Sequence, residues 1–273
     1  MIDTHVHFWN FDPVRDSWIN EDMKVIRQDF HPENLSGAYQ DLQITGCIAV
    51  QACQSEEENH FLLSLAEKNE IIKGIVGWVD LLDPNLGDRL NYWSNFKTIK
   101  GWRHILQAEN SAFILNSNFI EGIKLLKTYS YTYDLLCYHN QLPDIIKMVD
   151  QLPDQPFVLD HCGKPDVKKQ DLKAWAENIK ILASNSNVSC KVSGLLAEAD
   201  WKNWTEKEIF NCFDVVFEHF GTKRIMYGSD WPVMLISRPY EDWFNLVHQY
   251  TAQFSPEERQ LIFSDNAKAF YGV

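Results

Sequence analysis

Short apolar runs alternate along the chain with longer segments of mixed polarity. The runs are rich in β-branched and aliphatic residues and have the length of strands buried on both faces. We predict eight strands, at Ile2–Phe8, Ile44–Ala52, Ile71–Asp80, Ile99–Leu106, Thr132–Tyr138, Pro156–Cys162, Val188–Ser193 and Arg224–Ser229. This alternation favours a parallel sheet whose strands are connected by helices.

Segments between the predicted strands repeat apolar residues at three- and four-residue steps, which is typical of amphipathic helices. Thr205 with Glu208 fits a capping box at a helix start, Gly221 stands where a C′ glycine ends that helix, and Ser255 with Glu258 repeats the start pattern. The clearest apolar stripes are Leu172, Trp175, Ile179 and Leu182, and Ile209, Phe213, Val216, Phe217 and Phe220.

Eight strand–helix units fit the size of a (β/α)8 barrel, which typically has about 250 residues. We therefore predict an α/β fold, a TIM barrel formed as a single domain by residues 1–273. The connection from Trp9 to about Pro32 is long and aromatic, and we expect it to fold over the mouth of an active site.

Composition narrows the classes of function. The chain is 45% hydrophobic and 23% charged, and Asp+Glu (38) exceed Lys+Arg (25), giving a formal net charge of −13. This charge disfavours nucleic acid and anionic membranes as partners. No run approaches the roughly 20 apolar residues of a membrane span, and the first residues do not resemble a signal peptide, so we expect a cytoplasmic protein, with association of identical chains left open. Six cysteines without a CxxC pair indicate buried, reduced thiols.

Polar residues that can take part in catalysis or bind a metal lie at the ends of predicted strands, where barrel enzymes place their active sites. His5 and His7 end the first strand and share one face because side chains alternate along a strand. His161 ends the sixth strand and Asp230 follows the eighth. Three imidazoles and a carboxylate suit zinc or a similar divalent ion with a position left for water.

Six segments, in order, resemble the amidohydrolase superfamily, and within it the branch of sugar-lactone and 2-pyrone-4,6-dicarboxylate lactone hydrolases. The resemblance implies that His5, His7, His161 and Asp230 form a central cluster and that Asp230 handles the proton of the attacking water. The segments are DTHVHFW (Asp3–Trp9), GWRH (Gly101–His104), HNQLP (His139–Pro143), DHCGKP (Asp160–Pro165), KVSGL (Lys191–Leu195) and GSDWPV (Gly228–Val233).

The fourth predicted strand departs from the best-known pattern of this superfamily, in which a carbamylated lysine bridges two metals. Here that strand ends in Arg103 and His104. We therefore expect one divalent metal, with zinc the first choice, or no metal. His139, after the fifth strand, either replaces a metal ligand or contacts the substrate.

The remaining candidates are substrate-binding residues. Arg103 can clamp an anion or a hydroxyl group, and Lys164 can attract an anionic substrate. His104 has the opposite strand parity to Arg103, so both point inward only if the strand has already ended. The other candidates have structural alternatives: Lys191 can pair with a carboxylate, Gln51 and Trp78 can line a substrate wall, and Trp78 can equally pack in the barrel.

Together these features predict a hydrolase that opens a lactone, a small-molecule cyclic ester. Asp230 would accept a proton from water and return it to the leaving alkoxide, while a metal or His161 polarises the carbonyl. The same scaffold would also suit an amidase, a nonoxidative decarboxylase or a non-catalytic barrel that binds a sugar acid. Acid release without carbon dioxide would distinguish lactone opening from decarboxylation.

Overall fold

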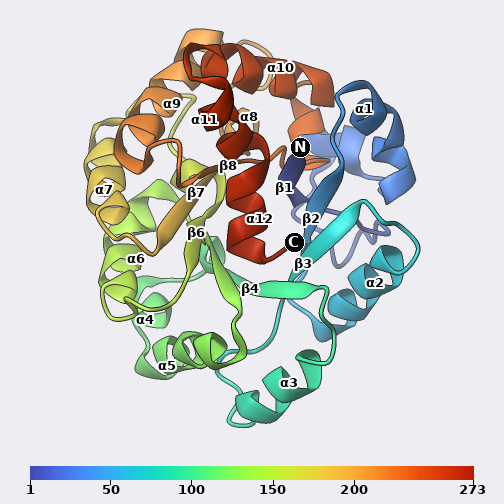
Figure 1. Ribbon diagram of the computed structural model, residues 1–273, viewed down its shortest axis with the longest axis vertical. Helices are drawn as coiled ribbons and strands as arrows, with labels where there is room; N and C mark the ends of the chain where they lie inside the picture. The colour runs from blue at the N-terminus through green and yellow to red at the C-terminus, as the bar shows by residue number, and fades with distance from the viewer.

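The computed structural model describes residues 1–273 and contains one eight-stranded sheet in the order β1 to β8. Each strand pairs in parallel with the next. The strands lie at the centre and the helices surround them (Figure 1), so the predicted (β/α)8 barrel is confirmed. The strands are β1 Ile2–Val6, β2 Gly46–Val50, β3 Ile72–Gly77, β4 Ile99–Ile105, β5 Thr132–Leu136, β6 Phe157–Leu159, β7 Val188–Val192 and β8 Ile225–Tyr227.

Twelve α-helices follow the strands, and their ends carry the predicted signals. Thr205 and Glu208 form the capping box of α9, Ser255 and Glu258 form that of α11, and Gly221 ends α9 with a φ of 64°. The helices are α1 Ser36–Asp41, α2 Glu56–Ala66, α3 Leu86–Trp93, α4 Ser111–Ile114, α5 Ser117–Leu126, α6 Leu142–Val149, α7 Lys173–Ala183, α8 Leu195–Glu198, α9 Glu206–Phe220, α10 Tyr240–Tyr250, α11 Pro256–Gln260 and α12 Asn266–Tyr271.

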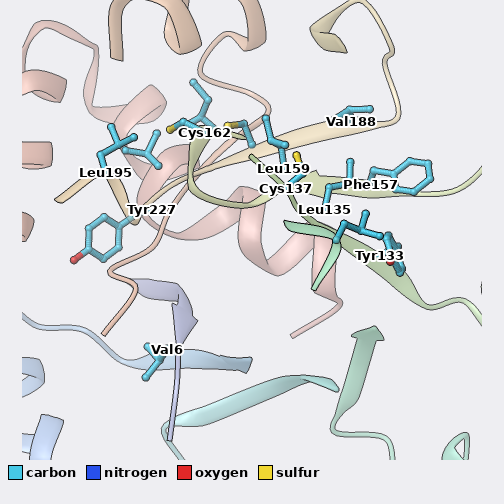
Figure 2. Close-up of a cluster of buried hydrophobic side chains, with 14 of the residues drawn as sticks. Val6, Tyr133, Leu135, Cys137, Phe157, Leu159, Cys162, Val188, Leu195 and Tyr227 are labelled. Carbon is cyan, nitrogen blue, oxygen red and sulfur yellow. The ribbon is translucent and has the colours of Figure 1, made fainter. Parts of the chain in front are cut away.

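The core has two layers because side chains alternate across each strand. Outward residues of β5 and β6, such as Tyr133 and Phe157, join a cluster of 70 buried residues beneath the helices (Figure 2). A smaller cluster of eight fills the barrel interior and includes Val158 together with Tyr271 of α12. Figure 1 shows α12 lying across the centre of the barrel, close to both chain termini. The C-terminal helix therefore plugs the N-terminal end of the barrel.

Several strands are shorter than predicted, and the difference falls where chemistry is expected. The sixth strand, predicted to reach Cys162, ends at Leu159, because His161 and Cys162 adopt positive φ angles of 53° and 55°. The eighth ends at Tyr227 rather than Ser229. His161 and Asp230 therefore lie on turns beyond the strand ends, and their side chains can point into the barrel mouth.

The connection between β1 and α1 folds back on itself at the mouth. Trp9 and Phe30 exchange backbone hydrogen bonds of 3.0 and 2.9 Å, and a short helix, Glu21–Ile26, lies between them. None of the helices combines the length and the apolar composition needed to cross a membrane. All six cysteines are unpaired, and five of them are buried.

Candidate active site

The ends of β1, β6 and β8 bring four predicted residues together. The Nε2 atoms of His5 and His7 lie 3.2 Å apart. Asp230 Oδ1 lies 3.4 Å from His7 Nε2, 3.8 Å from His161 Nε2 and 3.9 Å from His5 Nε2. All four side chains are buried. They form one compact cluster at the carboxyl ends of the strands, and we refer to it as the His–Asp cluster.

The backbone around His161 is unusual. His161, Cys162, Gly163 and Lys164 all have positive φ, from 47° to 70°. Left-handed conformations cost roughly 1–2 kcal/mol for each residue other than glycine, and such strain gathers at functional sites. Gly194 accommodates this turn, because a Cβ on it would lie 2.4 Å from His161 Nδ1.

Asp3 joins β1 to the turn that carries Asp230, a role that the sequence pattern did not reveal. Its Oδ1 accepts hydrogen bonds from the backbone N–H groups of His5 (3.1 Å) and Ser229 (2.8 Å). Its Oδ2 accepts from the hydroxyl of Tyr240 at 2.7 Å. Beside this brace, the Asp230 N–H donates to the His5 carbonyl at 2.9 Å. The two ligand-bearing segments are thus fixed to each other.

The electrostatic setting favours neutral imidazoles beside an ionised carboxylate. Burial lowers the pKa of His5 and lowers the pKa of His161 to about 4, despite the opposing charges of nearby aspartates. Burial alone would raise the pKa of Asp230, but His161, His7 and Lys164 together bring it below its ordinary value. At neutral pH His5 and His161 therefore offer unprotonated nitrogens, and Asp230 offers a carboxylate able to accept a proton.

The donor set fits a divalent metal. Three donor atoms, from His5, His161 and Asp230, lie within 4.8 Å of one another. The Nδ1 atoms of two imidazoles are bonded elsewhere, His7 to the Val50 carbonyl at 2.8 Å and His161 to Ser193 Oγ at 2.9 Å, which directs their Nε2 atoms into the cluster. Such outer partners orient the ligands of metal sites. Neutral nitrogens with one carboxylate are donors that zinc accepts.

Arg103 is buried and contacts the His–Asp cluster directly. Its Nη1 lies 3.2 Å from His5 Nε2 and 3.0 Å from Asp160 Oδ2, and its Nη2 donates to the Gln51 carbonyl. Only 3% of the residue is exposed. Two of the three guanidinium nitrogens thus have partners within the protein.

A cavity of about 280 Å³ opens onto the cluster. Trp9 and Trp18, from the connection between β1 and α1, lie on its wall, as the prediction of a mouth-covering segment requires. The polar lining is His7, Arg103, Gln107, His161, Lys164 and Asp230, and the apolar lining is Trp9, Trp18, Ala52, Ile105, Ala108, Leu136 and Val233.

Several predicted substrate-binding residues lie outside the lining of this cavity. His104 points away from Arg103, as its parity requires, with Nε2 3.0 Å from Glu109 Oε1 and Nδ1 3.5 Å from the indole nitrogen of Trp78. His139 Nδ1 lies 2.9 Å from the Lys164 carbonyl and so supports the left-handed turn.

Gln51 and Lys191 are wholly buried behind the cluster. Gln51 Nε2 donates to the Arg103 carbonyl at 3.1 Å, and Lys191 Nζ lies 2.5 Å from Asp134 Oδ2 and 3.0 Å from Asp160 Oδ1. Lys191 is therefore paired with carboxylates, the structural alternative to a substrate contact. The sequence pattern did not single out Asp160, although it stands in the DHCGKP segment directly before His161.

The chain matches the amidohydrolase family over residues 2–273 and belongs to that family. It is 34% identical over 284 residues to L-fucono-1,5-lactonase of Burkholderia multivorans, covering 100% of this chain and 96% of that protein. An L-fucono-1,5-lactonase of Burkholderia ambifaria is 27% identical over 277 residues, covering 100% of this chain and 95% of that protein.

A solved structure of an amidohydrolase from Burkholderia multivorans with bound zinc is also similar. It superposes with a TM-score of 0.97 at 34% identity and covers 100% of this chain and 99% of that chain. The resemblance inferred from the six sequence segments is confirmed.

Proposed function

We propose that this protein hydrolyses a neutral sugar lactone, a 6-deoxy aldonolactone of the L-fucono-1,5-lactone type. The observation that carries the proposal is the placement of an ionised Asp230 against three imidazole nitrogens at the floor of a cavity of about 280 Å³. The full-length similarity to two L-fucono-1,5-lactonases supports the substrate class.

Asp230 would act as the proton carrier. Its carboxylate accepts a proton from water while the water oxygen bonds to the lactone carbonyl carbon. The ring C–O bond then breaks, and Asp230 returns the proton to the departing alkoxide, leaving a hydroxy acid. His161 and His7 line the cavity beside Asp230. A divalent ion held by His5, His161 and Asp230, with zinc the proposed metal, would polarise the carbonyl and acidify the water.

The charges of the cavity favour a neutral substrate over a dicarboxylate lactone. Lys164 Nζ is paired with Glu198 at 2.9 Å, and Arg103 Nη1 is paired with Asp160 at 3.0 Å. Neither cation is free to neutralise a substrate carboxylate, and Asp230 adds a negative charge. The same pairing argues against a decarboxylase, whose substrate arrives as an anion.

The apolar part of the lining favours a 6-deoxy sugar. Ile105, Leu136 and Val233 offer a surface for a methyl group but no partner for a hydroxyl group. A hydroxyl desolvated against such a wall loses its hydrogen bonds to water, which lowers affinity.

The test is a pH-indicator assay with purified protein before and after chelation. We expect turnover of L-fucono-1,5-lactone, several-fold lower kcat/KM for L-galactono-lactone, and no turnover of 2-pyrone-4,6-dicarboxylate. Failure of every neutral lactone, together with carbon dioxide release from an aromatic carboxylic acid, would overturn the proposal.

A further inference from the structure

We propose that Gln107 is a specificity-determining residue, and that its carboxamide binds a ring hydroxyl group of the lactone on the side remote from the carbonyl carbon. Gln107 lies on the short turn Leu106–Ala108, which directly follows β4, and it lines the active-site cavity. The inference rests on the proposed function for the identity of the ring, and it adds the group that recognises the hydroxyls of that ring.

Gln107 brings to the cavity a carbonyl oxygen without a partner. Its Oε1 atom is shielded from solvent and accepts no hydrogen bond from the protein. The other polar residues of the lining are engaged: Arg103 and Lys164 pair with carboxylates, and the remaining three belong to the His–Asp cluster. Because an unpaired buried oxygen is costly, we interpret Gln107 as a group whose partner is a ligand.

The backbone that carries Gln107 is fixed by two other glutamines. Gln54 Oε1 accepts a hydrogen bond from the Ile105 N–H at 2.6 Å, and Gln141 Nε2 donates to the Leu106 carbonyl at 2.8 Å. The Leu106 side chain is wholly buried, which anchors the turn further. A binding group on a fixed backbone loses less conformational freedom when its ligand arrives. The amide of Gln107 is thus held at the cavity in advance.

The order of the strands places Gln107 across the cavity from Asp230. A parallel bridge between Val6 and Trp231 closes the barrel from β8 to β1, so β4 lies halfway around it from β8 (Figure 1). Gln107 follows β4 and Asp230 follows β8, and both line the cavity. A lactone whose carbonyl carbon lies beside Asp230 therefore presents the remote side of its ring to Gln107.

The chemistry of a primary amide suits a sugar hydroxyl group. The amide has both a donor and an acceptor, and so does a hydroxyl group, whereas the neighbouring Ile105 and Leu136 side chains have neither. The amide is also neutral, so it adds no preference for an anion. A lactone that lacks the hydroxyl group would cover the amide without pairing it, and sites of this kind discriminate strongly against such analogues. A glutamine that only faced solvent would instead have an accessible oxygen.

The test compares two lactones with the same ring. δ-Hexalactone keeps the six-membered ring and the methyl group of L-fucono-1,5-lactone but has no hydroxyl groups. Gln107→Met keeps the length of the side chain and removes its hydrogen-bonding atoms. We expect kcat/KM to fall roughly tenfold for L-fucono-1,5-lactone, the effect of one lost hydrogen bond, and to stay within about twofold for δ-hexalactone.

The ratio of the two kcat/KM values is therefore the decisive quantity. Gln253→Met is the matched control, because Gln253 is exposed on the turn after α10 and bonds only to the Tyr250 carbonyl. This control should leave the ratio unchanged. An equal fall for both lactones in Gln107→Met, as expected from loss of a backbone support such as Gln141, would overturn the proposal, and so would no fall for either. Gln107→Ala gives the same comparison if the methionine variant does not fold.

Binding of a ring that cannot be hydrolysed separates this proposal from the proposed function. 1,5-Anhydro-L-fucitol has a methylene group in place of the carbonyl and keeps the ring hydroxyls. If the wild type hydrolyses no lactone, the proposed function fails, and titration of this compound followed by NMR decides the role of Gln107. We expect roughly tenfold weaker binding by Gln107→Met than by the wild type. Equal affinities, or no binding by the wild type, would then overturn the assignment of Gln107.

Discussion

Gly194 leaves room for the imidazole of His161 because it has no Cβ. Gly194 has a φ of 67°, and a Cβ there would lie 2.4 Å from Nδ1 and 2.8 Å from Cβ of His161. The same imidazole depends on a 2.9 Å contact with Ser193 Oγ, the neighbour of Gly194. Backbone and side chain at this point of the KVSGL segment therefore place one member of the His–Asp cluster.

We expect Gly194→Ala to lower kcat by about 10²-fold, because displacements of about 1 Å at a catalytic group can cost that much. Steady-state kinetics on a verified lactone measures this loss. Gly37→Ala is the control: Gly37 lies in α1 with no atom within 4 Å of an added Cβ. A Gly194→Ala enzyme as active as Gly37→Ala would contradict the assignment.

Asp230 has the position of a proton carrier, so Asp230→Asn should keep the size of the side chain and remove the base. We expect kcat to fall roughly 10²–10⁴-fold, the range typical of general acid–base groups. Circular dichroism should show a retained fold. Near wild-type kcat in this variant would exclude Asp230 as the base.

Arg103→Met tests whether Arg103 acts only as a clamp for the substrate. A residue that only clamps the substrate would change KM alone. Because Arg103 is bound to His5 and Asp160 inside the cluster, we expect kcat to fall and the free energy of unfolding to decrease as well.

The buried imidazole of His161 makes stability depend on pH. Its pKa is about 4 in the folded protein and about 6.5 when unfolded. The unfolded chain therefore binds the proton first as pH falls, so stability is full above about pH 6.5 and declines toward pH 4. Between pH 7 and pH 5 we expect a loss of about 2 kcal/mol from this group, since each pKa unit corresponds to about 1.4 kcal/mol.

Urea unfolding of chelated protein at the two pH values measures that loss. His161→Gln lacks the titrating group and should show a correspondingly smaller decline. Equal declines in the wild type and the variant would show that other groups govern the acid side of the stability curve.

At the scale of elements, the strands and the two capping boxes could be predicted from the sequence because they follow local periodicity and side-chain chemistry. The turn from His161 to Lys164 could not. Only one of its four residues is a glycine, although all four are left-handed. Its conformation is set by partners distant in sequence, Ser193 and Gly194 on the next strand–helix connection. The contacts among the buried Asp134, Lys191, Tyr271 and Asp160 could not be predicted for the same reason, since these residues come from β5, β7, α12 and the turn after β6.

The connection between β1 and α1 supplies an aromatic wall to the cavity, and Trp18 is its exposed member, with 45% of its surface accessible. The Trp18 ring contacts Trp9 edge-on at 6.1 Å between centroids. We expect Trp18→Ala to raise KM several-fold with little change in kcat, because the wall contacts the substrate in the ground and transition states alike. Val14→Ala, at a position 84% exposed in the same connection, is the control. A fall in kcat at constant KM would place Trp18 in the chemistry instead.

At the scale of the whole molecule, the cationic side chains near the active site are largely paired with carboxylates of the same chain. The chain carries a formal charge of −13, yet Arg103, Lys164 and Lys191 are held within 3.0 Å of carboxylates around the barrel mouth and interior. A hydrolysis product that bears a new carboxylate meets no free cation there and faces Asp230. For the proposed neutral lactone, this arrangement would favour release of the acid product.

From the same pairing of charges we predict at most one metal ion in each chain. A binuclear centre needs a bridging ligand between two ions, and β4 instead directs the Arg103 guanidinium to within 3.2 Å of His5 Nε2. A second divalent ion would lie beside that fixed positive charge, without a carboxylate to bridge it to the first. The single donor group, His5, His161 and Asp230, suffices for one ion with a position left for water. Elemental analysis of protein purified with added zinc should therefore give at most one equivalent, and anomalous scattering should show one peak at the cluster. Two fully occupied ions about 3.5–4 Å apart would contradict this prediction and require Arg103 to leave the cluster.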